Sequence, residues 1–313
     1  MIAPHMGRVM LALIGLCAAM PALFAVLGEP FLTTVLTRAL IFAIAALSLD
    51  LILGFGAMVS FGHAAYLGIG AYSAGILAAN GISGLEIQLP VALGVAGLFA
   101  LVTGAISLRT KGVHFIMITL AFGQMAYFLM TSMSAYGGDD GMALAAPSTL
   151  FGLQVLGGPL RFFYVTLFVL MVLWLVLGRV VRSRFGRVLT GTRENLQRMQ
   201  AIGFSPFRYQ LTAYVISGMV ASVAGVLLAN HAAFVSPSYM GWARSGEMIA
   251  MVVLGGMGTL TGPVLGAIAF ILSEEALARL TIHWRLPFGA AVVLAVLFTR
   301  GGLIGALGKR GRK

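Results

Sequence analysis

Residues 31–53 read FLTTVLTRALIFAIAALSLDLIL and contain two charged side chains, those of Arg38 and Asp50. A helix of this length can cross the roughly 30 Å hydrocarbon core of a bilayer. Further apolar stretches lie at 9–28, 57–79, 89–108, 112–134, 162–180, 209–235, 247–281 and 286–299. They do not alternate between polar and apolar residues as the strands of an outer-membrane barrel do. The sequence therefore predicts an all-α polytopic integral membrane protein.

The composition excludes a soluble globular protein. Of the 313 residues, 60% are hydrophobic and 9% are charged, whereas a soluble domain averages about 25% charged residues. The apolar stretches take up most of the chain and leave little room for an extramembrane domain. We therefore expect residues 1–313 to form a single transmembrane domain of about eight to ten helices.

The positions of lysine and arginine predict the orientation, because cytoplasmic loops are enriched in both. Placing both termini in the cytoplasm puts fifteen of the twenty basic residues on that side, including those of 179–208 and of the basic C-terminal tail, 300–313. The loop 135–161, which carries Asp139 and Asp140, is then extracytoplasmic. The net charge of +11 thus reflects membrane orientation, and nucleic acid is not expected as a partner.

The stretch 247–281 is too long for one ordinary crossing, since a helix over its whole length would extend about 52 Å. It contains the run GGMGTLTGP at 255–263, which is rich in glycine. An even number of crossings is also required between the basic segment 179–208 and the basic tail. We therefore predict two short helices that meet at this run, as two crossings or as a re-entrant pair.

Motifs of common enzyme classes are absent from the sequence. None of the three lysines lies in a G-x-x-x-x-G-K-[ST] phosphate loop, and the five histidines form no H-E-x-x-H pair. Cys17 is the only cysteine, which excludes an intramolecular disulfide and a cysteine-based metal site. We therefore expect no catalytic, cofactor-binding or metal-binding residues, and any energy source must come from elsewhere.

Two glycine-rich segments, 54–70 and 255–266, interrupt apolar stretches in the two halves of the chain. Interrupted helices in matching positions of two halves indicate a transport pathway. The alternative for any single glycine is close helix packing, which small residues four positions apart permit. The candidates for pathway or packing are Gly62, His63, Gly68, Gly255, Gly256, Gly258 and Gly262.

Asp50, Gln124 and Glu247 are polar residues within or beside apolar stretches. A buried acid inside a membrane is costly and for that reason is a functional candidate. The alternative for Asp50 and Glu247 is a position near a helix end, within reach of interfacial water. For Glu247 this would be the outer start of a helix, where a negative charge is favourable. His63 is expected to be a hydrogen-bonded packing residue rather than a proton carrier.

The cytoplasmic segment at about 182–208 is predicted to dock onto a soluble partner. Residues 194–201 are compatible with a short helix that ends before Gly203 and Pro206. Leu196, Met199 and Ile202 lie three residues apart on one face, which suits insertion into a groove. The alternative is a basic helix that rests on anionic lipid.

The charged residues of this segment have separate expected roles. Glu194 is expected to meet basic groups at the rim of the groove. Arg193 and Arg198 are expected to face lipid phosphates or acidic residues of the partner.

Several runs are family-like: SLDLILG at 48–54, SFGHAAYLGIGAY at 60–72, TLAFG at 119–123, RFGR at 184–187, REN at 193–195, and 252–266. They resemble the LivH/LivM class of permeases of branched-chain amino-acid ABC importers, and the resemblance covers about 40–300. The order H-F-x-x-x-T-L-x-F-G at 114–123 is more similar to LivM than to LivH.

The resemblance implies a permease of the bacterial inner membrane that forms the pathway for leucine, isoleucine, valine or related small solutes. The implied partners are a LivH-like permease, two LivG/LivF-like ATPase subunits that bind ATP and Mg, an extracytoplasmic solute-binding protein and membrane lipid. It also implies coupling to an ATPase through Arg193, Glu194, Leu196, Met199, Ile202 and Gly203.

Two alternatives remain open for the function. Relatives of the same architecture resemble importers of urea, short amides or aromatic acids. A secondary transporter is the rival from another class, although such a carrier needs no docking helix.

Overall fold

The computed structural model describes residues 4–26, 28–144, 147–154, 156–280, 283, 285–298 and 301–305. The long helices are α1 (Pro4–Val26), α2 (Phe31–Leu53), α3 (His63–Ala79), α4 (Leu85–Ser107), α5 (Val113–Ser132), α6 (Pro159–Arg182), α9 (Pro206–Ala232), α10 (Trp242–Gly255), α11 (Thr261–Leu280) and α12 (Arg285–Phe298). The shorter elements are α7 (Arg184–Glu194), α8 (Leu196–Ala201), the 3₁₀ turns η1 (Ser134–Tyr136) and η2 (Pro237–Met240), and the strands β1 (Met142–Ala143) and β2 (Phe234–Val235).

The predicted all-α polytopic class is confirmed. Within the described residues, six helices are long and apolar enough to cross a membrane: α1, α2, α4, α5, α6 and α9. The expected count of about eight to ten included four further segments. Of these, α3, α10 and α12 have 17, 14 and 14 residues, and α11 carries Glu274, Glu275 and Arg279.

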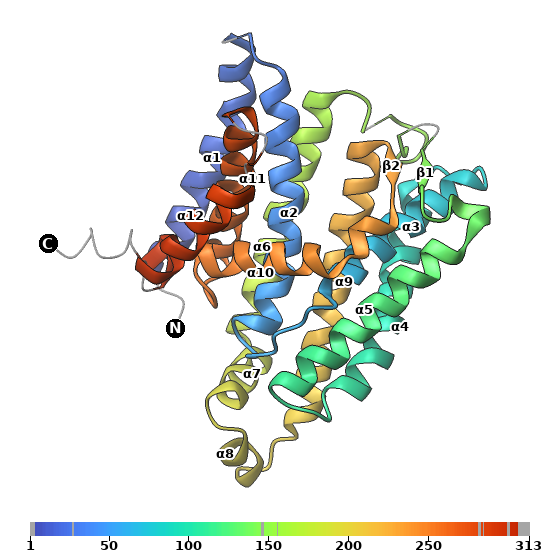
Figure 1. The fold of residues 1–313 in the computed structure, drawn as a ribbon. Coiled ribbons are helices and arrows are strands. Elements are labelled where there is room, and N and C mark those ends of the chain that lie inside the picture. The colour runs from blue at the N-terminus through green and yellow to red at the C-terminus, as the bar shows by residue number, and fades with distance from the viewer. Residues whose placement is uncertain are drawn as a thin grey trace, which may run out of the picture.

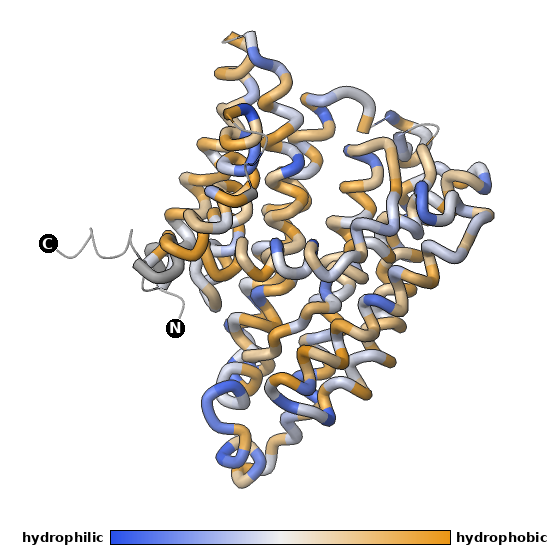
Figure 2. Tube along the Cα trace, in the orientation of Figure 1, coloured by the Kyte–Doolittle hydropathy of each residue, from blue (hydrophilic) through white to orange (hydrophobic). Residues whose placement is uncertain are grey.

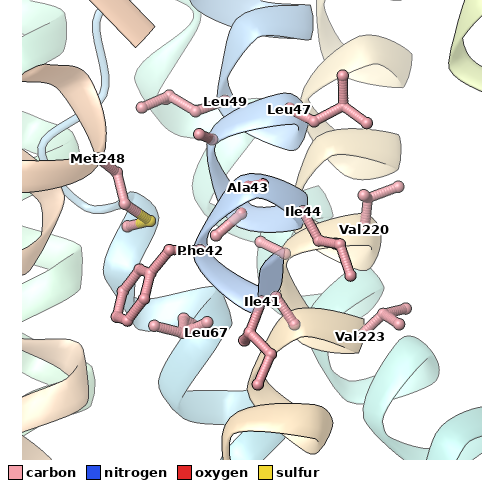
Figure 3. Packing of buried hydrophobic residues seen from close by; sticks show 14 of the residues in the cluster. Ile41, Phe42, Ala43, Ile44, Leu47, Leu49, Leu67, Val220, Val223 and Met248 are labelled. Carbon is pink, nitrogen blue, oxygen red and sulfur yellow. The ribbon is translucent and has the colours of Figure 1, made fainter. Parts of the chain in front are cut away.

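α2 is the central helix. In its most apolar stretch 94% of the residues are buried, compared with 17% for α1 and 22% for α5. Its sequence is apolar on every side, as expected for a helix surrounded by others. Figure 3 shows Ile44 of α2 beside Val220 of α9, and Phe42 beside Met248 of α10.

Close backbone contacts hold α3 against α9. A Cβ atom on Gly70 would overlap the Ser222 carbonyl, and one on Gly225 would overlap the Leu67 carbonyl. Lipid tails are as apolar as leucine, so apolar burial alone gives these helices little reason to associate in a bilayer. Close packing between small residues supplies that stabilisation instead.

The two ends of the helical bundle carry different elements (Figure 1). α7 and α8 lie at one end, where Figure 2 shows a concentration of hydrophilic residues. β1 and β2 lie at the opposite end and pair antiparallel, with Met142 opposite Val235. The segments 182–208 and 135–161 are therefore on opposite ends, as the charge pattern requires. The assignment of the cytoplasmic side remains a prediction, and residues 300 and 306–313 of the basic tail lie outside the described residues.

Two helices meet within 247–281, as predicted. α10 ends at Gly255 and α11 begins at Thr261, and the two pack against each other. We call residues 256–260 the break loop. Figure 1 shows α10 lying across the direction of α2, α6 and α9. The chain therefore changes direction at the break loop, from the crosswise α10 to α11.

Candidate functional site

Asp50, in the last turn of α2, binds the break loop. Its Oδ1 accepts a hydrogen bond from the Gly258 N–H at 2.7 Å, and its Oδ2 accepts one from the Leu260 N–H at 3.1 Å. These amides precede α11, whose N-terminal end carries a partial positive charge. Buried carboxylates are tolerated where such donors pair with them. Asp50 therefore joins the end of α2 to the break loop.

The alternative expected for Asp50 was a position near a helix end, within reach of water. The position near a helix end is right, but the access to water is wrong. Asp50 does lie near the C-terminal end of α2, but its exposed fraction is 0%. The break loop covers the carboxylate and replaces water as its hydrogen-bond donor.

Backbone conformation explains the glycines of the break loop. Gly256 and Gly258 have φ angles of +117° and +73°, which glycine adopts at little cost because it has no Cβ. For Gly258 this differs from the predicted reason, close packing. A Cβ there would lie 3.2 Å from the Gly54 carbonyl oxygen, which is tight but not an overlap.

Gly255 and Gly262 are held by close packing, as the sequence suggested. A Cβ on Gly255 would overlap the Gly262 carbonyl, and one on Gly262 would overlap the Gly256 carbonyl. The ends of α10 and α11 therefore contact each other directly through their backbones.

Arg193, at the end of α7, also reaches this site. Its Nη1 donates to the carbonyl of Gly54, the residue that follows α2. The last carbonyls of a helix lack intrahelical partners and carry partial negative charge, so a cation is favourable there. The expectation that Arg193 faces lipid phosphates or a partner's acidic residues is therefore corrected.

His63, the first residue of α3, makes a second polar contact with α2. Its Nε2 is 2.9 Å from the Ser48 Oγ, and that hydroxyl donates to the Ala45 carbonyl at 2.7 Å. Nε2 is therefore the donor to Ser48. The adjacent Ala64 N–H donates to the Ser245 Oγ of α10 at 2.9 Å. These contacts are those of the hydrogen-bonded packing residue that the sequence suggested.

Gly62 and Gly68 place α3 against two other elements. A Cβ on Gly62 would overlap the Thr119 carbonyl of α5, whereas one on Gly68 would overlap the Met240 side chain of η2. Gly62 is thus required by a backbone contact. At Gly68 the neighbour is a flexible side chain.

Gln124 and Glu247 do not share the hydrogen-bond partners of Asp50. Gln124 is half-buried on α5. Glu247 binds Arg244 at 2.5 Å, one turn earlier in α10. The expectation of an N-terminal helix charge is corrected, because α10 begins at Trp242 and has no acidic residue in its first turn.

The short docking helix begins later than the expected 194–201. Glu194 is the last residue of α7 rather than part of the short helix, and α8 begins after Asn195. The Asn195 Oδ1 accepts from the Arg198 N–H at 2.9 Å, a favoured N-cap arrangement that ends one helix and begins the next. Gly203, with φ +92°, ends the turn that follows α8.

The three apolar residues of this segment do not share one exposed face. Leu196 and Met199 are half-buried, while Ile202 is 62% exposed. Met199 packs on α7, since a Cβ on Gly191 would lie 2.8 Å from its Sδ. Phe204, which sequence reasoning missed, is 39% exposed beside Ile202 in the chain. Ile202 and Phe204 are therefore exposed apolar side chains at this end, as is Phe207 in the first turn of α9, also 39% exposed.

A cleft of about 300 Å³ lies at the same end of the bundle. It is bounded by the 56–59 loop, the turn between α4 and α5, α8 and the start of α9. Leu196 lines it, which explains why this side chain does not project outward. Nothing in the amino-acid sequence indicates the cleft, because its walls come from four separated segments.

No group of three or more His, Cys, Asp or Glu side chains that could hold a metal ion occurs in the part of the chain that the structure describes.

Comparison with known proteins gives a consistent result. Residues 31–299 match the family described as "Branched-chain amino acid transport system / permease component". The "High-affinity branched-chain amino acid transport system permease protein LivM" of Escherichia coli (strain K12) is 30% identical over 291 residues, which are 86% of this chain and 68% of that protein. LivH of the same strain is 27% identical over 284 residues, 84% of this chain and 91% of that protein.

A more distant relative matches in part. The "Autoinducer 2 import system permease protein LsrC" of Photorhabdus laumondii is 33% identical over 153 residues, 46% of each chain. No solved structure matches.

Proposed function

We propose, from the premise that the chain belongs to the family of branched-chain amino acid transport system permease components, that it forms one half of the membrane pathway of an ABC importer. The solutes are leucine, isoleucine and valine. ATP and Mg are bound by separate ATPase subunits, since the sequence has no phosphate loop.

The observation that carries this proposal is the similarity to LivM along nearly the whole chain, together with the exposed α7–α8 end. A secondary transporter has no need of such an element. Ile202 and Phe204, 62% and 39% exposed, present apolar surface at this end, and Arg198 and Arg208 are close to them in the sequence. This combination fits a groove on a soluble ATPase subunit.

Similarity to both LivM and LivH supports a second, LivH-like permease as the other half of the pathway. Two ATPases on the cytoplasmic side and a solute-binding protein on the other complete the proposed importer. The bacterial inner membrane is the location proposed for it.

Reconstitution tests the proposal. The chain is co-purified with its LivH-like partner, two ATPases and binding protein, and uptake of labelled leucine into liposomes is measured with and without ATP at the ATPase side. We expect ATP-dependent uptake of leucine, isoleucine and valine. ATP-dependent uptake of urea or a short amide instead would change the solute but keep the class. Leucine uptake by this chain without ATPases would establish the secondary-transporter alternative.

A further inference from the structure

The end of α7 and the break loop meet at the last turn of α2. Arg193 binds the Gly54 carbonyl, and its Nη1 is 3.6 Å from the position that a Cβ on Gly258 would occupy. The Gly54 N–H donates to the Asp50 carbonyl at 2.8 Å, and the Asp50 side chain binds the Gly258 and Leu260 amides. Three segments far apart in the chain thus converge within a few side-chain contacts.

Arg193 lies two residues before Asn195, the N-cap of α8. α7 packs on α8 as well as on α6 and α9. A displacement of α8 would therefore move the guanidinium group relative to both the Gly54 carbonyl and Gly258.

We propose that Arg193 is a positioning residue that transmits movement of α8 to the break loop between α10 and α11, through Gly54 and the Asp50 carboxylate. This inference rests on the proposed function, because it takes the ATPase as the source of the movement. It assigns to Arg193 an inward role in place of the expected contact with lipid or partner.

The chemistry of the contact explains why arginine suits this role. Its planar guanidinium carries several donors in fixed directions, so it can hold a carbonyl and remain close to a carboxylate. When it moves away, the Asp50 carboxylate loses a neighbouring cation and is held by the break-loop amides alone. The break loop, built on two glycines of positive φ, can then rearrange.

Spin labels at two positions test this transmission in the full importer. Cys17 is replaced by alanine, and single cysteines are introduced as Met257→Cys in the break loop, 49% exposed, or Gln197→Cys on α8. In the parent protein, an ATP analogue is expected to change label mobility at both positions. With Arg193→Gln, the label at 197 should still respond, the label at 257 should not, and ATP-driven leucine uptake should fall at least tenfold.

The matched control is Arg187→Gln, which removes an exposed arginine from the same helix. It is expected to leave both label responses and uptake unchanged. Arg193→Lys, which keeps a cation and a donor, should recover part of the response at 257. Arg193→Met, which keeps the aliphatic bulk, serves if the glutamine variant does not assemble, and should also abolish the response at 257.

A full response at 257 in Arg193→Gln or Arg193→Met would overturn the proposal, as would equal loss in Arg187→Gln. Failure of the proposed function is distinguishable, because the parent importer would then show neither ATP-dependent leucine uptake nor an ATP-dependent change at either label.

Discussion

The Oδ1 atom of Asp50 on α2 and the backbone N–H of Gly258 in the break loop are joined by a 2.7 Å hydrogen bond across 208 positions of sequence. With the second bond to Leu260, this contact holds the loop at which the chain turns from α10 into α11. A buried acid that the sequence marks as a functional candidate thus accepts hydrogen bonds from two backbone amides.

Asp50→Leu is expected to destabilise the protein and reduce uptake. It leaves the Gly258 and Leu260 amides without an acceptor, and each unsatisfied buried group costs about 1–3 kcal/mol. Thermal unfolding of the detergent-purified protein should show a clearly lowered midpoint. Asp50→Asn, which keeps one acceptor oxygen, should be intermediate. An unchanged midpoint in Asp50→Leu would mean that these hydrogen bonds contribute no stability.

Gly258→Leu should abolish uptake more than it reduces assembly. A side chain at φ +73° costs roughly 1–2 kcal/mol in backbone strain, and it must also fit beside Gly54 and Arg193. Uptake and membrane abundance are measured together. Gly94→Leu is the control, because a Cβ on Gly94 meets no atom within 4 Å. Normal transport by Gly258→Leu would reduce the break loop to a connection without functional consequence.

Ile202→Ala with Phe204→Ala should weaken ATPase binding while leaving the chain inserted. Truncation of an apolar anchor at an interface can cost about 2 kcal/mol or more, and these two side chains are exposed. Co-purification of the ATPase and solute-stimulated ATP hydrolysis measure the effect.

Met199→Ala is expected to act differently, by loosening the packing of α8 on Gly191 of α7. The sequence pattern puts Met199 and Ile202 on the same docking face and so suggests the double variant Met199→Ala with Ile202→Ala. That variant would combine a loss of packing at 199 with a loss of docking surface at 202. If Ile202→Ala with Phe204→Ala couples normally, the segment is a basic element resting on the membrane.

Cysteine labelling tests the orientation. In a Cys17→Ala background, Asp140→Cys should react with a membrane-impermeant maleimide in intact spheroplasts, because 135–161 is expected outside. Gln197→Cys should react only after the membrane is opened. The reverse pattern would invert the topology and remove the basis on which an even number of crossings was inferred between 208 and the tail.

The sequence identifies many residues of the site, but it does not show which of them contact one another. The glycine-rich run at 255–263 predicts an interruption, since two crossings or a reversal were required there, and the structure has the break loop at 256–260. Asp50 could be singled out because an acid in an apolar stretch is costly. Its partners could not, because the Gly258 and Leu260 amides carry no sequence signal and lie more than 200 positions away.

The amino-acid sequence by itself determined the class of protein: a helical membrane protein whose apolar stretches are set by bilayer thickness, with a family resemblance that the comparisons confirmed. Hydropathy and charge act along the chain, so they can be read from it. Only the tertiary structure decided that α2 is central, that Met199 packs inward while Ile202 projects, and that Arg193 and Asp50 meet around Gly54. Those outcomes depend on which segments pack together, and in lipid that choice is made by close backbone contacts and buried hydrogen bonds rather than by hydrophobicity.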